Sequence, residues 1–322
     1  MKRKGYIIEE IIKRDNIEDS FDYVIRTKCK KNLKSKRNWL ANKDKVIQEL
    51  QESISSGEFK ISRYSEYTIK ERDKERVIQS IPLKDRIALN AIMKVVEKYL
   101  NKRFISDSAA SIKDRGGHYL KSRMKKDMLE YPEFTRVTYK CDIKKFYQSI
   151  NQEVLIKVLN RYFKDKKLIK ILTNAITMLP SGISIGLRTS QALGNMLLDY
   201  VIDHIIKDRE GCRFYRRYCD DIVIQCKDMY SVTKYVKIIK ENLNKIGLVI
   251  KGNEQVFYTK DRGVDFLGYI TYNNGHTKIR KHIKKRFSER WKRVKSNKRR
   301  ISLLGSFYGI AKHADTRNLF KK

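Results

Sequence analysis

The chain has 322 residues, 41% of them hydrophobic, so it can bury a core and we expect a folded, enzyme-sized protein with two or three subdomains. Its 73 Lys and Arg against 37 Asp and Glu give a formal net charge of +36, which repels itself unless a polyanion neutralises it. Because 12 Phe, 19 Tyr and 2 Trp accompany this charge, we favour a folded nucleic-acid enzyme over a ribosome-like or chromatin-like basic protein.

Cysteine usage and the apolar segments indicate the compartment. The cysteines are Cys29, Cys141, Cys212, Cys219 and Cys226. They contain no Cys-x-x-Cys pair, so we expect neither zinc nor disulfides but reduced core positions. The first residues lack an apolar leader and no run reaches the length of a membrane span. These features predict a cytoplasmic protein without a membrane partner.

Residues 1–63 are predicted to form a basic helical segment. One apolar stripe begins at Ile7 and another at Val46, each at helical spacing. The basic run 28–37 lies between them, and it is either a solvated loop or a contact to a phosphate backbone.

Residues 64–80 are predicted to form two strands joined by a charged turn, and residues 81–86 lead into a helix through Ile87, Ile92, Val95 and Val96. Lys70, Lys74 and Arg76 are either surface charges of this hairpin or ligands of a triphosphate, whose oxygens Arg forks onto and Lys attracts. The stretch 104–118 ends in a Gly pair beside Arg115, and its flexible backbone would allow nucleic acid to approach closely.

Residues 137–143 alternate as a half-buried strand, with Asp142 on the opposite face from Tyr139 and Cys141. Tyr147 follows, and a turn would bring its ring back over Asp142. The alternative is a surface Asp followed by a core aromatic pair.

Helices are expected near residues 155–163 and 169–176, and a loop at 180–186 contains Gly186. A long helix opens at Thr189, which Ser190 would cap. Gln191 and Asn195 share a helix face that is small and polar enough to accept a template base or sugar edge. The alternative is an N-cap with a helix-packing glycine at Gly194.

The segment Tyr218-Cys219-Asp220-Asp221 is predicted to be the tip of a β-hairpin. Paired acids between apolar strands are poor solubilising charges but good ligands for a hard cation. An ordinary Asp-rich turn is the alternative. A helix through 232–243, a strand at 248–250 and a hairpin at 263–270 are expected next, and this alternation predicts an α+β fold.

Residues 278–300 contain thirteen Lys and Arg and one Glu. Apolar residues from Ile279 through Phe287 and Trp291 to Val294 fall at helical spacing. We expect a basic helix that docks on the protein through this stripe and faces a duplex, with a last helical segment near 303–316.

The order of Asp142, the loop before Ser190-Gln191 and the acidic hairpin resembles that of bacterial retroelement reverse transcriptases, over nearly the whole chain. The resemblance implies an α+β right-hand polymerase. It would have fingers at 64–135 with parts of 151–185, a palm at 136–275 whose antiparallel sheet carries the acidic hairpin, and a basic helical thumb at 276–322.

The resemblance also implies an activity and a site. Two Mg²⁺ ions, for which Mn²⁺ would substitute, would be held by Asp142, Asp220 and Asp221 for RNA-directed DNA synthesis. Tyr147 would clash with a 2′-hydroxyl and so select deoxynucleotides. The implied nucleotide-binding residues are Lys70, Lys74, Arg76, Tyr147 and Gln191, and the implied nucleic-acid-binding residues are Arg115, Gly186, Ser190, Asn195, Tyr218, Phe266, Leu267, Gly268, Tyr269, Lys284, Lys285, Arg290 and Arg293.

Within this family, residues 185–191 and 306–320 look like those of diversity-generating retroelements. Such enzymes use an element-encoded RNA template, a primer that is extended into cDNA, deoxynucleoside triphosphates, a small accessory protein and a structured non-coding RNA. Ile112 and Leu187-Arg188 depart from their pattern, and Lys251 and Lys260 are the candidates for the lysine that usually donates a proton to pyrophosphate. These departures leave phage-defence reverse transcriptases open. A catalytically idle RNA-binding protein and an RNA-dependent RNA polymerase are further alternatives, and Tyr147 argues against the latter.

Overall fold

The computed structural model of the chain describes residues 3–29, 32–71 and 74–316, and the side chains of Glu71 and Lys74 lie outside this description. The chain forms two compact units. The first contains residues 1–105, 144–204 and 242–249, and the second contains residues 106–143, 205–241 and 250–322. Each unit is therefore assembled from stretches that are far apart in the sequence.

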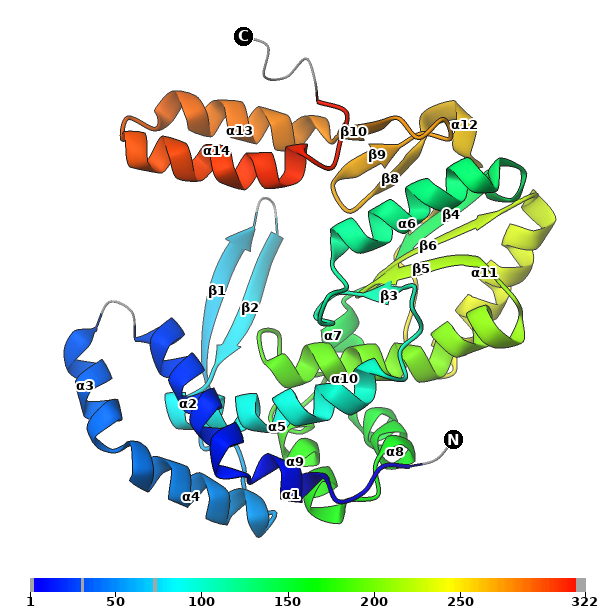
Figure 1. Cartoon of the computed structure of the whole chain (residues 1–322). Coiled ribbons are helices and arrows are strands. Elements are labelled where there is room, and N and C mark those ends of the chain that lie inside the picture. Colours follow the sequence, from blue (N-terminus) through cyan, green and yellow to red (C-terminus); the bar gives the residue numbers. More distant parts are fainter. Residues whose placement is uncertain (1–2, 30–31, 72–73, 317–322) are drawn as a thin grey trace. The chain divides into compact units, whose positions relative to one another are not determined.

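The first unit is mainly helical (Figure 1). Its helices are α1 (Ile7–Ile11), α2 (Arg14–Lys28), α3 (Leu33–Ala41), α4 (Lys43–Ser55), α5 (Leu83–Asn101), α7 (Phe146–Ser149), α8 (Gln152–Tyr162), α9 (Lys166–Ile176) and α10 (Arg188–Leu198), the last continuing as the π-helical turn η2 (Asp199–Asp203). The helix α5 contacts α1, α2, α4 and α10, because apolar residues occupy most of its circumference. The helices predicted from apolar stripes are confirmed.

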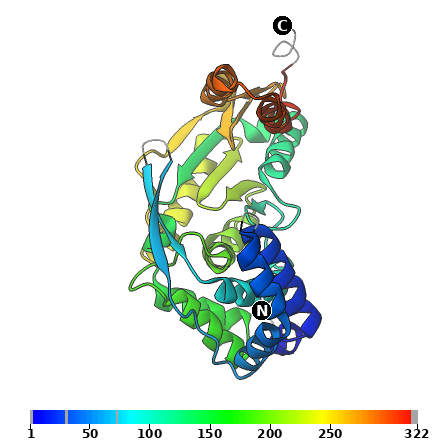
Figure 2. The same ribbon diagram turned by 90° about the vertical axis from the view of Figure 1, so that its left-hand side faces the viewer.

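The basic run and the charged hairpin predicted for the first unit have different outcomes. The basic run 28–37 is largely helical rather than a loop, because α2 extends to Lys28 and α3 begins at Leu33, while residues 30 and 31 lie outside the described part. The predicted charged hairpin is confirmed as β1 (Ser65–Glu71) paired antiparallel with β2 (Lys74–Ser80), which Figure 2 shows as a long two-stranded ribbon.

The second unit contains a five-stranded sheet in the order β3-β5-β6-β4-β7. Its strands are β3 (Ser108–Ala109), β4 (Val137–Asp142), β5 (Phe214–Tyr218), β6 (Asp221–Cys226) and β7 (Gln255–Tyr258), all antiparallel to their neighbours except the β3–β5 pair. The predicted acidic hairpin is thus confirmed as β5–β6. The predicted strand at 248–250 is wrong in extent, because only Ile250 forms a bridge, to Ile143.

Helix α6 (Gly117–Glu130) packs on one face of this sheet. Leu120, Met124 and Met128 on α6 form a buried cluster with Val223 of β6 and Phe266. The other helical segments of the unit are η1 (Pro132–Thr135), the π-helical turn η3 (Ile205–Arg209), α11 (Met229–Asn244) and α12 (Thr259–Arg262). Burial of one apolar stripe of α6 against alternate strand residues holds the sheet in place.

A smaller sheet and two helices complete the second unit. The sheet has the order β10-β9-β8, with β8 (Val264–Phe266), β9 (Tyr269–Thr271) and β10 (Thr277–Ile279), and α13 (Lys281–Arg293) and α14 (Asn297–Ala311) follow. The single basic helix expected at 278–300 is therefore wrong: Ile279 belongs to a strand and Val294 ends α13. Ile283 and Phe287 of the stripe pack against a buried cluster that includes Phe307 of α14, and the half-buried Phe287 stacks on Phe307 with ring centroids 4.0 Å apart.

All five cysteines are free thiols. Four of them occupy the buried positions that the sequence predicted, whereas Cys219 is partly exposed. Among the helices of the described residues, none combines the length and apolarity that crossing a bilayer requires.

Candidate active site

Two of the three predicted catalytic acids face one another in the second unit. Asp142 is the last residue of β4 and Asp221 is the first residue of β6, and the antiparallel register pairs them directly. Directly paired residues point to the same face with Cβ atoms about 5 Å apart. The register therefore brings together carboxylates that are far apart in the sequence.

Backbone hydrogen bonds fix the acidic residues on both sides. The Lys251 N–H donates to the carbonyl oxygen of Asp142 at 2.8 Å, and the Ile143 N–H donates to the carbonyl oxygen of Asp220 at 3.1 Å. The end of β4 and the β5–β6 turn are thus tied together directly.

Asp221 lies in an environment that opposes its ionisation. Burial, with the negative charges of Asp142 and Asp220, raises the pKa of Asp221 to about 7, against the opposing effect of the positive charges of Lys140 and Arg280. Its Oδ1 is buried and accepts no hydrogen bond from any described residue. A carboxylate in this state gains a partner if a cation binds.

The residues present fit a hard cation by their chemistry. Carboxylate oxygens are the ligands that Mg²⁺ prefers, and the Asp142–Asp221 pair together with the buried Asp221 Oδ1 supplies them. In the described part of the chain, no three His, Cys, Asp or Glu side chains converge closely enough to hold an ion as a group.

The predicted primer grip is a tight hairpin turn. Leu267 and Gly268 have φ of 52° and 90°, which suits a two-residue loop between β8 and β9. Phe266 and Tyr269 are buried, so their side chains anchor the turn in the core rather than contact nucleic acid. Of these four residues, Leu267 and Gly268 are the two that are partly exposed. The predicted contact with nucleic acid is therefore limited to the turn itself.

The first unit holds the predicted sugar gate. Tyr147 lies on α7 against Phe146, with ring centroids 5.2 Å apart. A Cβ added at Gly194 of α10 would lie 3.0 Å from the Phe146 ring and 3.3 Å from the Tyr147 ring. Gly194 is therefore a packing glycine, and its lack of a side chain lets α10 support the gate.

The start of helix α10, which follows the loop at 180–186, differs from the prediction. Helix α10 begins at Arg188 with Leu187 as its N-cap residue and no side-chain cap, so the predicted capping role of Ser190 is wrong. Ser190 and Asn195 are buried in α10, whereas Gln191 is exposed. Of these three residues, Gln191 is the one whose side chain is exposed at the surface.

The hairpin cations are divided between two faces. The register pairs Lys70 with Glu75 and Ile69 with Arg76, so Lys70 and Arg76 point to opposite faces. Lys74, whose side chain lies outside the described part, pairs with Glu71 and has the same strand parity as Arg76. A triphosphate lying against one face of the hairpin would therefore meet Lys70 or Arg76 and not both.

Gln79 connects the hairpin to the loop before α10, and sequence reasoning missed it. Its Oε1 accepts hydrogen bonds from Ser184 Oγ at 3.1 Å and from the Ile185 N–H at 3.0 Å. A Cβ added at Gly186, whose φ is 111°, would lie 2.9 Å from the Ile78 side chain. Gly186 thus permits close packing against the hairpin, a role that no local pattern indicated.

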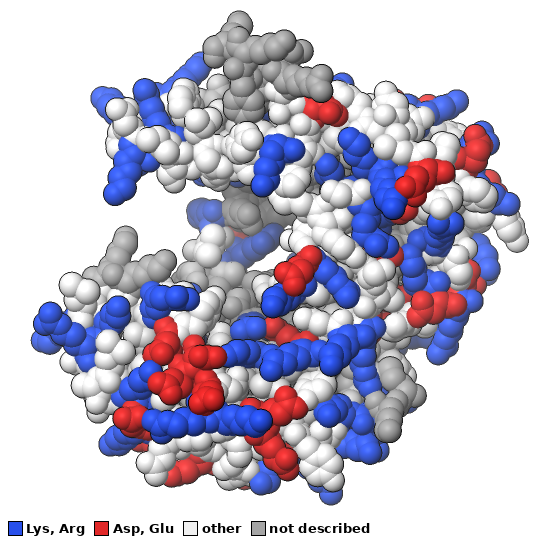
Figure 3. All heavy atoms as spheres, in the orientation of Figure 1, with Lys and Arg blue, Asp and Glu red and all other residues white. Residues whose placement is uncertain are grey.

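The predicted nucleic-acid contacts of the last helices are accessible. Lys285, Arg290 and Arg293 are exposed on α13, and Lys284 is half-buried. Figure 3 shows Lys and Arg side chains projecting from the surface of α13 and α14, with few acids among them. Arg115 is half-buried in the loop before α6, next to a buried Ile112 at the position where the family pattern has Arg.

Two lysines beside the acids were also missed or left open by sequence reasoning. Lys140 has the same strand parity as Asp142 and donates to the Asp265 carbonyl oxygen at 2.7 Å. Lys251 is brought to Asp142 by its backbone hydrogen bond, whereas Lys260 lies on α12. Strand alternation alone could have placed Lys140, but the position of Lys251 depends on the tertiary structure.

An antiparallel sheet with facing acids at the ends of its central strands, one of them on a tight hairpin, defines the palm of a nucleic-acid polymerase. The comparison with protein families agrees, since residues 69–271 match the model of the reverse transcriptase (RNA-dependent DNA polymerase) family. The chain belongs to this family, whose members are nucleotidyltransferases that polymerise DNA on RNA. No curated protein sequence matches the chain.

Solved telomerase structures share the fold. The telomerase of Candida albicans, in complex with the TWJ fragment of telomeric RNA, has a TM-score of 0.52 and 13% identity over 70% of this chain and 47% of its own. Apo telomerase of Candida tropicalis, truncated from its C-terminal domain, has a TM-score of 0.51 and 15% identity over 68% and 55%. The chain spans about half the length of these telomerases, and at this identity the likeness shows the fold alone.

Proposed function

We propose that this chain copies an RNA template into cDNA, extending a primer with deoxynucleoside triphosphates at the Asp142–Asp221 pair. The observation that carries the proposal is the direct pairing of these two acids on a sheet of the reverse transcriptase fold. In this proposal residues 1–63 form an N-terminal segment, 64–135 with parts of 151–185 the fingers, 136–275 the palm and 276–322 the thumb. Free thiols are consistent with a cytoplasmic location.

The acids would hold the divalent ions that such chemistry requires. Asp142 and Asp221, with Asp220 on the turn, would bind two Mg²⁺ or Mn²⁺ ions, which lower the barrier by activating the primer hydroxyl and neutralising the triphosphate. Lys140 and Arg280 offset part of the negative charge near Asp221. Lys251, whose backbone N–H binds the Asp142 carbonyl oxygen, would be the lysine that supplies a proton to the leaving pyrophosphate.

The remaining predicted residues would bind the substrates. Tyr147 would exclude the 2′-hydroxyl, and the exposed Gln191 would contact the nucleotide or template. The half-buried Tyr218 packs against the cluster of α6 and would support the primer end together with the Leu267–Gly268 turn. The exposed cations of α13 would contact the backbone of the template and primer duplex.

Primer extension on an RNA template tests the proposal. Purified wild-type chain with Mg²⁺ and deoxynucleotides should extend the primer, while Asp142→Asn and Asp220→Asn should abolish extension. Asp261→Asn removes an exposed acid of α12 in the same unit and serves as the matched control. Activity that survives Asp220→Asn, or extension that prefers ribonucleotides, would contradict the assignment. No incorporation by a folded wild-type chain would favour the idle RNA-binding alternative.

For the biological role, we propose a diversity-generating retroelement enzyme that copies an element-encoded RNA with an accessory protein and a structured non-coding RNA. The support is the resemblance of residues 185–191 to that branch. The departure at Arg188 keeps the phage-defence branch as the second candidate, and here Arg188 forms a two-pronged ion pair with Glu97 of α5. Sequencing of cDNA made by the purified chain distinguishes them, because errors concentrated at template adenines are expected of the first branch alone.

A further inference from the structure

Arg217 is a fully buried cation next to the acidic turn. It lies on β5 with a relative exposure of 0%. Its Nη1 donates to the carbonyl oxygen of Cys219 at 2.9 Å, and its Nη2 donates to Ser108 Oγ of β3 at 2.8 Å. One guanidinium thus ties the turn to the edge strand of the sheet.

Cys219 has a backbone conformation that costs free energy for a residue with a side chain. Its φ is +57°, in the left-handed region, at the position where a two-residue hairpin loop commonly has glycine. Both of its peptide groups are held, since its N–H donates to the Ala109 carbonyl oxygen at 3.4 Å and its own carbonyl accepts from Arg217. The surroundings therefore hold Cys219 in a conformation that it would rarely adopt alone.

Arg217 and Asp221 lie on opposite faces of the sheet. Tyr218 is paired with Asp221, so Arg217, its neighbour on the strand, points to the other face of the sheet from Asp221. Its backbone N–H also donates to the Asp107 carbonyl oxygen at 2.9 Å. The strand geometry thus separates Arg217 from Asp221, whereas its hydrogen bond to the Cys219 carbonyl oxygen reaches the turn directly.

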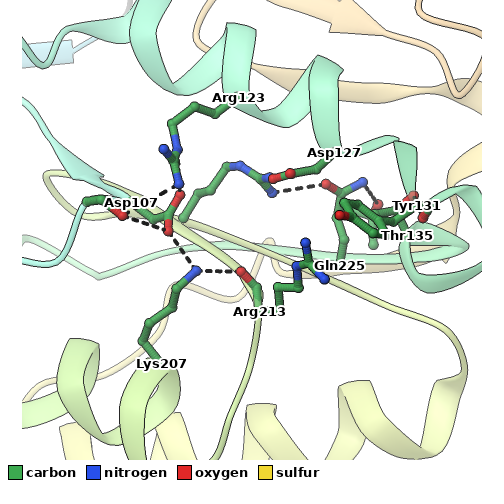
Figure 4. A network of polar contacts seen from close by, with 11 residues as sticks. Asp107, Arg123, Asp127, Tyr131, Thr135, Lys207, Arg213 and Gln225 are labelled. Atoms are coloured by element: carbon green, nitrogen blue, oxygen red, sulfur yellow. Dashed lines mark hydrogen bonds and ion pairs between the residues drawn. The ribbon is translucent and has the colours of Figure 1, made fainter. Parts of the chain in front are cut away.

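The neighbouring Arg216 provides a contrast. It is equally buried, with an exposure of 1%, but its guanidinium pairs with Asp127 and donates to Gln225 Oε1 at 3.2 Å. Asp127 and Gln225 belong to the network in Figure 4, in which Asp107 also binds Arg123 and Lys207. This network lies against α6 and η3, so Arg216 supports the packing of the sheet and makes no contact with the turn in these hydrogen bonds.

We propose that Arg217 is a positioning residue that holds Cys219 in its left-handed conformation and thereby sets the geometry in which Asp220 and Asp221 bind divalent cations. The inference rests on the proposed function of these acids. A glycine at position 219 adopts a positive φ without assistance. The substitution Cys219→Gly should therefore compensate for loss of Arg217 if Arg217 acts by holding this backbone conformation, but not if it only supports packing.

The test uses five variants: Arg217→Met, Arg217→Lys, Arg216→Met, Cys219→Gly and the double variant Arg217→Met/Cys219→Gly. Four quantities are measured for each full-length chain. They are kcat and KM for dTTP on a poly(rA)/oligo(dT) template-primer, the Mn²⁺ dissociation constant by electron paramagnetic resonance, and Tm by circular dichroism. Rates are expressed per folded molecule.

Arg217→Met should lower kcat and weaken Mn²⁺ binding by at least about tenfold each, with little change in KM. Adding Cys219→Gly should recover most of both losses, although it restores no contact of Arg217. Arg217→Lys cannot bind both acceptors with one planar group, so its kcat and Mn²⁺ affinity should lie between those of the wild type and Arg217→Met. Arg216→Met should lower Tm without a specific change in Mn²⁺ affinity.

The proposal is overturned if the double variant binds Mn²⁺ as weakly as Arg217→Met, or if Arg216→Met weakens Mn²⁺ binding equally. Failure of the proposed function has a different signature, namely a wild-type chain that binds Mn²⁺ but incorporates no nucleotide. In that case the Mn²⁺ comparison still tests the role of Arg217. A wild-type chain that binds no Mn²⁺ overturns both proposals.

Discussion

Asp142 and Asp221 face each other on adjacent antiparallel strands, and Asp221 Oδ1 is buried without a hydrogen-bond partner among the described residues. Like charges directly opposite each other on a sheet destabilise it. The fold therefore carries this repulsion at the position where a cation would relieve it.

The first prediction concerns stability without divalent ions. The pKa of Asp221 is raised from 3.8 to about 7 in the folded chain, so the folded state binds more protons than the unfolded state between these values. Stability should therefore fall as pH rises from about 4 through 7. Asp221→Asn should raise Tm at pH 8 and much less at pH 4.5. Mg²⁺ should raise Tm at pH 8 for the wild type more than for the variant, and equal shifts would contradict the assignment.

The second prediction concerns the choice of sugar. If the Tyr147 ring excludes the 2′-hydroxyl, Tyr147→Ala should increase ribonucleotide use relative to deoxynucleotide use by at least about tenfold, since loss of a steric clash removes the discrimination. Tyr147→Phe keeps the ring that packs against Phe146 and Gly194, and it should discriminate like the wild type. Single-nucleotide incorporation with matched dNTP and rNTP measures both. Unchanged discrimination in Tyr147→Ala would place the gate elsewhere.

A third prediction compares two glycines with similar backbone conformations. Gly182 and Gly211 have φ of 64° and 71°, but a Cβ at Gly182 would lie 2.6 Å from the Gln148 carbonyl oxygen, whereas a Cβ at Gly211 would meet nothing within 4 Å. Gly211→Ala should cost about 1–2 kcal/mol of unfolding free energy through backbone strain alone. Gly182→Ala should cost about 1–3 kcal/mol more because it also forces the backbone of α7 to move. Urea denaturation measures the difference. Equal losses of unfolding free energy would show that the backbone near Gly182 accommodates the added Cβ at no cost.

The fourth prediction is a pH effect in the second unit. His118 and His313 stack with ring centroids 3.9 Å apart, and burial together with nearby positive charge, which includes Lys121, lowers the pKa of both. The unfolded chain therefore binds more protons than the folded chain just below pH 6.5, and stability should fall on acidification through that region. Tm should drop less between pH 7.5 and 5.5 for His118→Gln/His313→Gln than for the wild type. An identical drop in Tm for the wild type and the variant would show that protonation of this histidine pair does not affect stability.

The fifth prediction concerns the basic surface of α13. Lys285→Gln/Arg290→Gln/Arg293→Gln should reduce the slope of log affinity against log salt for an RNA–DNA duplex by about 2–3, because each lost phosphate contact removes about 0.7–0.9. A control of equal net charge is Lys227→Gln/Lys234→Gln/Lys237→Gln, in and just before α11. Fluorescence anisotropy at several salt concentrations measures both. A control that reduces the slope as much would show that binding follows net charge rather than α13.

The sequence by itself determined the features that depend on local periodicity and composition. Alternation marked β4 with Asp142 at its end, the acids between β-branched residues marked the β5–β6 hairpin, and apolar stripes marked most helices. These patterns predict structure correctly because side-chain direction follows directly from strand and helix geometry. The net charge of +36 similarly indicates a polyanionic partner, because it depends on composition and not on the arrangement of the chain.

The tertiary structure alone decided which residues meet and which are buried. Sequence patterns could not give the register that pairs Asp142 with Asp221, because it depends on contacts between distant strands. They also gave no sign that Ser190 and Phe266 are buried, or that Arg217 lies wholly inside the protein beneath the acidic turn. Burial of an arginine depends on acceptors supplied by other strands, here Ser108 Oγ and the Cys219 carbonyl, and such a set exists only after the chain has folded.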